Sequence, residues 1–296
     1  MFFSLLCTAC LATVAPLKQA GDAVQSAEPA FGQATTKIEG PLIELLPGDP
    51  ELLPIKVETG AFYFLATVNG KPTIAILDPL SEKTLIDIRF AREAGIALKE
   101  NRGTIDTRYG RKEWTLTDTL SVEVGTKFKL TGPVRAVDLT HRYQLGGRPV
   151  GIIISRQMID PIAVVIAFQN GTIWFAPPTY YTQGSLATAP YADGVVQVSI
   201  NGTPARLAID FDQETELELG IAAKDKFPLD PRGKVTVSMD GFARETAPGV
   251  NPRIFDPGLD GSLGVGFFHG GMLILDGPAG LIKMAVPNGM TASVSP

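Results

Sequence analysis

The sequence predicts a mainly β protein with short helices, folded as two lobes built on one plan. Hydrophobic residues make up 45% of the 296 residues and charged residues 19%, while 31 Gly and 23 Pro interrupt the apolar runs, which is typical of many short strands joined by turns. The length fits two lobes of roughly 100 to 130 residues each, enough for a real core. The third observation is an internal repeat, because residues 68–78 return as residues 200–210 without insertion or deletion.

Each copy of the repeat is predicted to be a hairpin that ends on an acid. Asn69-Gly70 in the first copy and Asn201-Gly202 in the second separate two apolar runs, and such pairs supply the positive φ values of a tight turn. The second strand of each hairpin runs into Asp78 or Asp210. A carboxylate is costly to bury alone, so we expect the two acids to meet each other or a shared water at a pseudo-twofold axis.

The chain before the repeat is predicted to hold a leader and an arm. Residues 1–20 contain an apolar run without a preceding Lys or Arg, too short to span a bilayer but suited to a secretory signal. Thr8-Ala9-Cys10 is similar to the end of a bacterial lipoprotein signal, although Cys7 stands where such signals usually carry Leu. We therefore expect an exported protein, periplasmic or extracellular, whose membrane contact would come only through a lipid anchor on Cys10.

The remaining boundaries follow from composition. Residues 42–57 are apolar but broken by prolines, so we expect them to lie against a lobe as an edge strand. A stretch rich in Pro, Tyr and Gly separates the lobes. The predicted organisation is a linker or arm over 21–58, a first lobe over 59–178, a linker over 179–190, a second lobe over 191–290 and a tail over 291–296.

The elements of the first lobe are expected in the following order. A hairpin comes first, then a short strand, a short amphipathic helix that stops near Gly95, a hairpin with a polar tip, a strand pair, a buried apolar run, a second short helix and a closing hairpin. These elements are predicted at 62–77, 84–87, 88–98, 104–125, 128–137, 151–154, 156–159 and 163–175.

The second lobe repeats this order in shorter form. The hairpin is followed by a short segment, a strand, a Gly-apolar run and a closing hairpin, which agrees with the first lobe more closely than chance repetition would. These elements are predicted at 195–210, 217–223, 234–239, 261–268 and 272–284.

Charge and composition exclude several function classes. A net charge of -5 leaves no basic footprint, so nucleic acid is not expected as a partner. The two histidines, His141 and His269, are far apart in sequence, and both cysteines lie in the leader, so no metal, cofactor or disulfide is expected in the folded body.

This organisation resembles the aspartic protease family, in particular bacterial retropepsin-like proteins that carry two protease halves in one chain. The resemblance rests on the Asn-Gly-x-Pro hairpins that run into Asp78 and Asp210 and on the closing Phe-Gln-Asn-Gly at 168–171. It also rests on Gly-Ser-Leu-Gly-Val-Gly-Phe-Phe at 261–268, which is similar to the family's Gly-Ile-Leu-Gly-Met-Asp-Phe-Leu. Over residues 62–286 it implies a bilobal, aspartic-protease-like double β-barrel with a pseudo-twofold repeat.

The resemblance also implies a site. In that family two carboxylates share a proton and activate a water that attacks a peptide carbonyl, so Asp78 and Asp210 would be the catalytic dyad. Tyr109, at the tip of the polar hairpin, would lie where the family's flap covers the substrate. Ser81 and Asp212, beside the two acids, complete the expected substrate-binding residues, and the expected partner is an extended peptide or an unfolded protein segment.

The sequence departs from the family motif Asp-Thr-Gly at both acids. Asp78 is followed by Pro79-Leu80, and Asp210 by Phe211-Asp212. In the family the hydroxyl bonds across to the other lobe, and Gly lets the backbone donate to the carboxylate. The carboxylates are therefore expected to lose their supporting frame, and Asp212 adds a third charge that disturbs a shared proton. In the first lobe Ile154-Ser155 stands where the family has Gly-Met.

Three functions follow, of which the first is favoured. The chain is an aspartic-protease-like protein that keeps a peptide-binding cleft with weak or lost peptidase activity, which would bind peptide by strand addition. Alternatively, it is an active aspartic endopeptidase with an Asp78/Asp210 dyad. In the third, it is a non-catalytic scaffold or assembly protein.

Overall fold

The computed structural model describes residues 41–58, 61–107, 110–139, 144–178, 186–252 and 258–285. The chain divides into two units, residues 1–39 and 40–296, and every described residue belongs to the second. The predictions on the leader, Cys10 and Tyr109 lie outside the described residues. No helix within the described ranges is long and apolar enough to cross a membrane.

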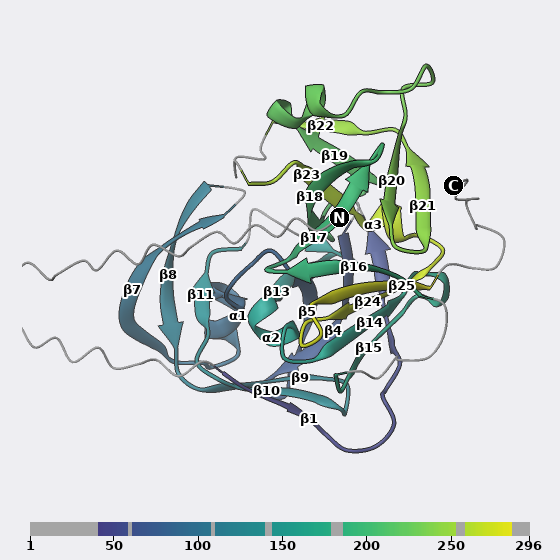
Figure 1. The fold of residues 1–296 in the computed structure, drawn as a ribbon. Helices are drawn as coiled ribbons and strands as arrows, with labels where there is room; N and C mark the ends of the chain where they lie inside the picture. The colour runs from purple at the N-terminus through teal and green to yellow at the C-terminus, as the bar shows by residue number, and fades with distance from the viewer. Residues whose placement is uncertain are drawn as a thin grey trace, which may run out of the picture. The chain divides into compact units, whose positions relative to one another are not determined.

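The first sheet is built from the first half of the chain (Figure 1). Its strands are β1 (Leu42–Leu45), β3 (Lys56–Glu58), β4 (Ala61–Val68), β5 (Lys71–Asp78), β6 (Leu85–Asp87), β7 (Leu98–Thr107), β8 (Gly110–Thr117), β9 (Leu120–Val124), β10 (Phe128–Gly132), β11 (Arg135–Val137), β12 (Gln144–Leu145) and β13 (Arg148–Ser155). They lie in the order β1-β10-β9-β4-β5-β13-β6-β11-β8-β7, with β3 beside β4 and β12 beside β13. Helices α1 (Ile88–Glu93) and α2 (Arg156–Ile159) follow β6 and β13.

The second sheet combines both halves of the chain. Its strands are β2 (Leu53–Pro54), β14 (Ala163–Ala167), β15 (Thr172–Ala176), β16 (Ala187–Ala192), β17 (Val195–Ile200), β18 (Thr203–Asp210), β19 (Leu217–Gly220), β20 (Val235–Met239), β21 (Phe242–Thr246), β22 (Gly249–Asn251), β23 (Gly261–Gly264), β24 (Met272–Asp276) and β25 (Leu281–Ala285). They lie in the order β2-β15-β14-β24-β25-β16-β17-β18-β23-β19-β22, and β20 connects β17 to β21. The helices here are η1 (Phe168–Asn170), η2 (Ile221–Lys226) and α3 (Val265–Phe268).

The two halves share one strand order. In the first half β5 has the parallel partner β13, which pairs antiparallel with β6, and β6 pairs parallel with β11. In the second half β18, β23, β19 and β22 repeat these relations one by one. Asp78 and Asp210 are the last residues of the two equivalent strands, β5 and β18. The predicted mainly β, bilobal fold is confirmed.

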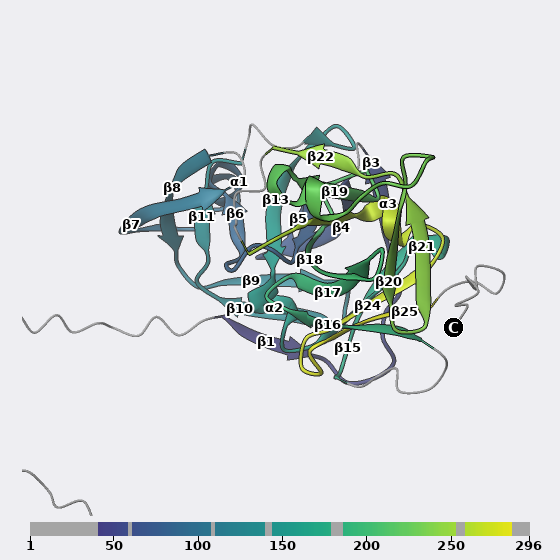
Figure 2. The ribbon, with the colours of Figure 1, turned by 45° about the horizontal axis from the view of Figure 1, so that its top comes forward.

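Strands of both halves pair within the second sheet. β14 pairs antiparallel with β15 on one side and with β24 on the other, and Figure 1 shows these strands side by side with β25. Figure 2 shows β24 beside β25 from another direction. All five residues of β14 are buried. One hydrophobic cluster spans both halves, so the core is continuous between them.

Most predicted elements form. α1 ends at Glu93, close to Gly95 where the helix was predicted to stop, because Gly95 adopts a positive φ of 71° and β7 begins at Leu98. Three predictions need correction. Residues 128–137 hold two strands that pair with other strands and not with each other. β16 occupies residues 187–192, part of which was expected to be linker. Residues 42–57 do include an edge strand, β1, but β2 joins the other sheet.

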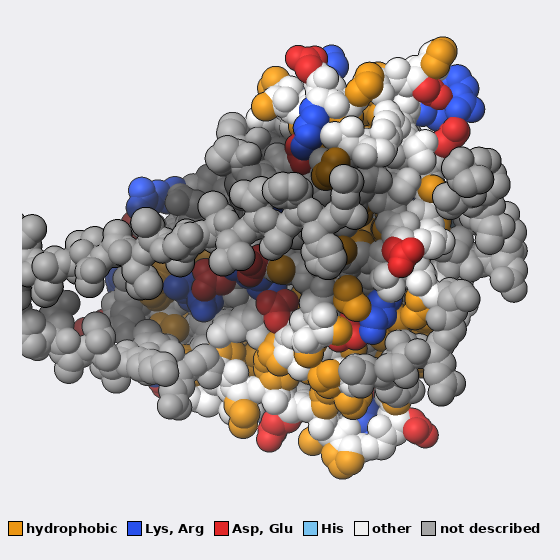
Figure 3. Space-filling model, viewed as in Figure 1, with side chains coloured by type: hydrophobic (Ala, Val, Ile, Leu, Met, Phe, Trp, Pro, Cys, Tyr) orange, Lys and Arg blue, Asp and Glu red, His pale blue; other side chains and the backbone are white. Residues whose placement is uncertain are grey.

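The edge at β1 carries exposed apolar side chains. Leu42 is 62% exposed and Leu46 is 46% exposed. Figure 3 shows orange side chains gathered in the lower part of the molecule, where Figure 1 draws β1. A strand at a sheet edge with apolar neighbours is a surface prone to association.

The Asn-Gly turns that open the two acid-bearing strands have the same structure. Asn69 and Asn201 have φ values of 48° and 51°, and the following glycines have 76° and 79°. Each Asn side chain also accepts a hydrogen bond at 2.8 Å from a backbone N–H of a neighbouring strand or its flank, from Ser121 to Asn69 and from Thr236 to Asn201. Each Asn therefore sets the turn and fixes it to the sheet.

Replacing Asn69 should separate these two contributions. Asn69→Gly keeps the positive φ and removes the side-chain hydrogen bond, so unfolding in urea should become easier by about 1 kcal/mol. Asn69→Ala removes the same bond and keeps a β-carbon in the left-handed region without the polar side chain that makes this conformation acceptable for Asn, so it should be less stable than Asn69→Gly by about 1 to 2 kcal/mol. Equal stability of the two variants in urea titrations would show that the turn does not need a positive φ at residue 69.

Candidate active site

The two predicted acids lie at the ends of equivalent strands, each beside a parallel neighbour. Asp78 pairs with Ser155 of β13, and Asp210 pairs with Gly264 of β23. Asp210 is 7% exposed and Asp78 is half-buried. Both strands run through the core as buried apolar segments before they deliver the carboxylate.

Backbone N–H groups support both carboxylates. Oδ1 of Asp78 accepts hydrogen bonds from the backbone nitrogens of Leu80 at 3.1 Å and Ser81 at 3.2 Å. Oδ1 of Asp210 accepts one from the backbone nitrogen of Asp212 at 3.0 Å. The expectation that the carboxylates lose their frame is therefore wrong for these donors, since a main-chain N–H can donate from Leu or Asp as well as from Gly.

The residue after each acid lies at a contact between segments, and at Phe211 this contact is apolar. The Phe211 ring packs edge-on against Phe62 of β4, with 4.8 Å between ring centroids, and against Phe268 at 6.3 Å. Phe62 belongs to the first sheet and Phe211 follows β18 of the second. On the other side the backbone carbonyl of Pro79 lies against Gly194 of the β16–β17 turn. At Phe211 aromatic packing thus connects the halves where the family has a hydroxyl hydrogen bond.

Gly194 brings the two acid-bearing segments together. Its carbonyl accepts a hydrogen bond from the backbone nitrogen of Ile209, the residue before Asp210, at 2.8 Å. A β-carbon at residue 194 would lie 2.3 Å from the carbonyl oxygen of Pro79, the residue after Asp78. Gly194 therefore touches both segments, and its φ of 78° completes the Asp193-Gly194 turn. Sequence reasoning missed this residue, although an Asp-Gly pair between apolar runs was its signal.

When the two halves are compared by sequence, Ile154 of the run before α2 corresponds to Gly264, but the structure shifts this correspondence by one residue. The ladder between β13 and β5 is irregular between Val150 and Ile152, which displaces Gly151. Ser155, and not Ile154, therefore occupies the place that Gly264 has in the second half. Its hydroxyl lies 3.0 Å from that of Thr84, so a side chain is accommodated where the other half cannot take one, because a β-carbon on Gly264 would lie 2.2 Å from the carbonyl oxygen of Thr215.

This geometry can be compared with known proteins. No protein-family model matches the sequence, and no curated protein matches it. Among solved structures, the crystal structure of the aspartic proteinase from Irpex lacteus matches with a TM-score of 0.56 and 12% sequence identity, over 84% of this chain and 100% of that one. The chain has the aspartic proteinase fold. At this identity the likeness shows the fold alone, so it does not show the bacterial retropepsin-like subgroup.

In this aspartic proteinase fold the other expected site residues have these positions. Ser81 donates its backbone N–H to Asp78, and its hydroxyl donates to the carbonyl of Lys83 at 3.0 Å. Asp212 is half-buried and donates its backbone N–H to Asp210. Ser81 and Asp212 thus donate backbone hydrogen bonds to the two acids. Within the described ranges no group of three or more His, Cys, Asp or Glu side chains could hold a metal ion.

Charged and polar groups surround the Asp78 side of the site. Arg156 follows Ser155, donates its backbone N–H to the Ser81 carbonyl at 3.1 Å, and forms an ion pair with Asp193 at 2.8 Å. Tyr191 is buried, and burial first, then the charge of Asp160, raises the pKa of its hydroxyl. Asp78 and Asp193 raise that pKa further. Among the described residues, the Tyr191 hydroxyl and Oδ1 of Asp160 have no hydrogen-bond partner.

Asp160 should make stability depend on pH. Burial raises the pKa of its carboxyl above 3.8, an effect that Arg156 partly opposes. The folded state then binds the proton more tightly than the unfolded state, so stability increases as the pH falls through the raised pKa towards 3.8. Asp160→Asn, which resembles the protonated form, should be more stable than the wild type at neutral pH by up to about 1 kcal/mol after solvent screening.

The measurement is a series of urea titrations of both proteins between about pH 3 and pH 7. The advantage of Asp160→Asn should shrink as the pH falls, because the wild-type carboxyl then becomes neutral as well. An advantage that stays constant across the series would show that the ionised carboxylate is not the source of the penalty.

Proposed function

We propose that the chain is an exported aspartic-protease-like protein that binds an extended peptide at Asp78 and Asp210 and has weak or no peptidase activity. The observation that carries this proposal is the packing after the two acids. Phe211 packs its ring on Phe62 of the first sheet, the backbone of Pro79 lies against Gly194, and neither Pro79 nor Phe211 can donate a hydrogen bond from a hydroxyl. Neither acid is therefore followed by the hydroxyl donor that the family's Asp-Thr-Gly motif supplies.

The free energy lost with the two hydroxyl hydrogen bonds supports a reduced rate of peptide cleavage. A hydrogen bond to a charged group is worth about 1.5 to 3 kcal/mol, and about 1.4 kcal/mol corresponds to a tenfold change in rate. Loss of the hydroxyl donor in both loops would remove several powers of ten. Peptide binding does not depend on these donors, because an extended peptide binds through main-chain hydrogen bonds.

An active aspartic endopeptidase is the second candidate, and one observation favours it. The backbone donors to Asp78 and Asp210 are present in both halves, at 3.0 to 3.2 Å. With these donors the pair could still hold and polarise a water between the carboxylates. The two candidates differ in rate and use the same residues.

The experiment measures cleavage and binding of an unfolded protein at acidic pH. In the favoured case the wild type binds a labelled peptide and cuts it very slowly, and Pro79→Thr, which supplies a hydroxyl, increases cleavage. Asp78→Asn and Asp210→Asn should abolish any cleavage, while Asp118→Asn, an exposed acid elsewhere, should not. Rapid wild-type cleavage that both Asn variants abolish would favour the endopeptidase. If the wild type neither binds nor cleaves the peptide, the scaffold hypothesis is favoured instead.

Export is part of this proposal and rests on the sequence alone. Expression of the full chain in a bacterium should place the protein outside the cytoplasm. Lipid attachment at Cys10 would be shown by labelling with a fatty acid that Cys10→Ser abolishes. Cytoplasmic accumulation of the full chain would contradict export without affecting the proposal for the two acids.

A further inference from the structure

The ladder of the first sheet has a gap along one side of β4. β3 pairs with β4 only as far as Tyr63, and β9 begins to pair with it only at Thr67. Within the described chain, residues 64–66 therefore have no ladder partner on that side. Since successive residues of a strand point their N–H and C=O groups to opposite sides, at least one of the three directs both groups into the gap. Such groups can form hydrogen bonds with the backbone of an added strand.

A pocket of about 320 Å³ lies at this gap, which we call the Leu65 pocket. It is lined by Lys56, Tyr63, Leu65, Ile74 and Arg148, among others. Leu65 and Ile74 are direct cross-strand partners, and Leu65 is 58% exposed although it lies in the middle of β4. The volume is in the range of small-ligand sites, and the apolar surface is at its centre.

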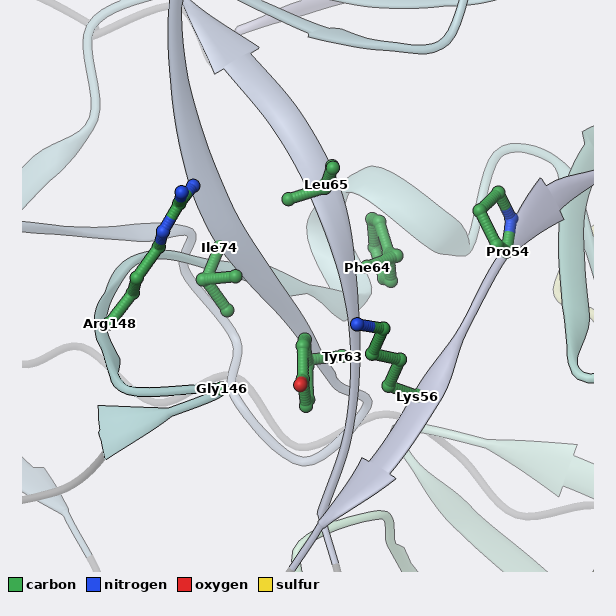
Figure 4. A pocket seen from close by; sticks show the side chains of 8 residues that line it. All are labelled: Pro54, Lys56, Tyr63, Phe64, Leu65, Ile74, Gly146 and Arg148. Atoms are coloured by element: carbon green, nitrogen blue, oxygen red, sulfur yellow. The ribbon is translucent and has the colours of Figure 1, made fainter.

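Two cations flank this apolar surface. Figure 4 shows Lys56 and Arg148 on opposite sides of Tyr63 and Ile74, Lys56 reaching in from β3 and Arg148 from β13. Both side chains are exposed, and neither forms an ion pair or hydrogen bond with the described residues. An Arg guanidinium can bind a carboxylate with two parallel hydrogen bonds, and a Lys ammonium adds a second charge.

The nearby acid does not neutralise these cations. Oε2 of Glu58 accepts hydrogen bonds from the backbone nitrogen of Gly146 at 2.6 Å and from the Tyr63 hydroxyl at 3.3 Å. This carboxylate therefore accepts hydrogen bonds from the β12–β13 turn and from Tyr63 rather than forming an ion pair with either cation among the described residues. Glu58 keeps its negative charge, so the net charge of Lys56, Arg148 and Glu58 is +1.

We propose that the Leu65 pocket binds the carboxyl end of an extended peptide with apolar last residues. The terminal carboxylate lies between Lys56 and Arg148, the last side chains cover Leu65 and Ile74, and the peptide backbone pairs with residues 64–66. A fatty acid shares the carboxylate and the apolar chain but has no backbone to fill the ladder gap, so the gap favours a peptide. The pocket is separate from the Asp78 and Asp210 loops, and the proposal does not depend on the proposed function.

The test titrates the full chain with a labelled tetrapeptide that ends in Val-Leu and measures fluorescence anisotropy. Asp78→Asn is used as the background, so that cleavage at the two acids cannot affect the reading. The free acid should bind, and the same peptide with a C-terminal amide should bind at least about tenfold more weakly, because the charge-assisted bonds are lost. Decanoate is the probe for the fatty-acid alternative and should displace the peptide poorly.

Variants then assign the site. Arg148→Gln, Lys56→Gln and Leu65→Ala should each weaken binding of the free acid by roughly tenfold, and because their side chains are exposed the fold should stay intact. Arg89→Gln, which removes an exposed cation elsewhere, is the matched control and should bind like the background. Equal binding of acid and amide, binding unaffected by all three variants, decanoate bound more tightly than the peptide, or no binding at about 1 mM peptide would each overturn the proposal.

Discussion

Lys283→Met is expected to lower the free energy of unfolding by about 3 to 5 kcal/mol, the usual cost of leaving one member of a buried ion pair without its partner. Nζ of Lys283 donates to Oδ2 of Asp276 at 2.6 Å, and the two side chains are 11% and 1% exposed. Asp276 lies on β24 and Lys283 on β25, and both are on the sheet face that also buries Ala163 and Ile274. Met matches the length of Lys but supplies no charge, so the variant leaves an ionised carboxylate in an apolar setting. Urea unfolding at neutral pH measures the loss.

Two further variants identify the cause of this loss. Lys283→Met with Asp276→Asn removes both charges and should recover a large part of the stability, since the Asn carbonyl can still accept the 3.2 Å hydrogen bond that Oδ1 of Asp276 receives from the backbone nitrogen of Ala279. The matched control is the exposed pair Lys99 and Asp118, where Asp118→Asn should cost at most about 1 kcal/mol. If Lys283→Met lowers the free energy of unfolding no more than Asp118→Asn does, the ion pair between Lys283 and Asp276 does not stabilise the second sheet.

The parts of the fold that the sequence could predict depend on short-range patterns. An Asn-Gly pair between apolar runs specifies a hairpin by itself, and two copies that align without insertion or deletion indicate that the hairpins are equivalent. The strand order shared by the two halves agrees with this reasoning, and so does the placement of Asp78 and Asp210 at the ends of β5 and β18. The four residues of α2 were also predicted with their correct bounds.

The remaining features depend on contacts between residues far apart in sequence. The pairing of β14 with β24 joins segments about a hundred residues apart, and no local pattern identifies such a partner. The irregular ladder at Gly151 moved the alignment by one residue, because one displaced residue shifts everything after it. The packing of Phe211 on Phe62 could not be derived either, since in sequence Phe211 was only a departure from a motif.

Gly194→Ala should destabilise the protein strongly, although it adds only one methyl group near the candidate site. The added β-carbon would lie 2.3 Å from the Pro79 carbonyl oxygen and 2.7 Å from its carbon, and both are backbone atoms that cannot move aside alone. The φ of 78° adds strain of about 1 to 2 kcal/mol, and forced overpacking typically adds a further 1 to 3 kcal/mol. We therefore expect a loss of about 2 to 5 kcal/mol in urea unfolding, together with displacement of the Asp78 loop.

Gly202→Ala is the matched control, because the strain is the same and the contact is absent. Gly202 has a φ of 79° in the equivalent position of a hairpin turn, and nothing lies within 4 Å of a β-carbon there. Its substitution should cost only the strain of about 1 to 2 kcal/mol, so the difference between the two variants measures the contact between the β16–β17 turn and the Asp78 loop. Any peptide binding or cleavage at the acids should fall in Gly194→Ala and persist in Gly202→Ala. Equal costs for the two variants, with binding unchanged in both, would show that Gly194 does not hold the two acid-bearing segments together.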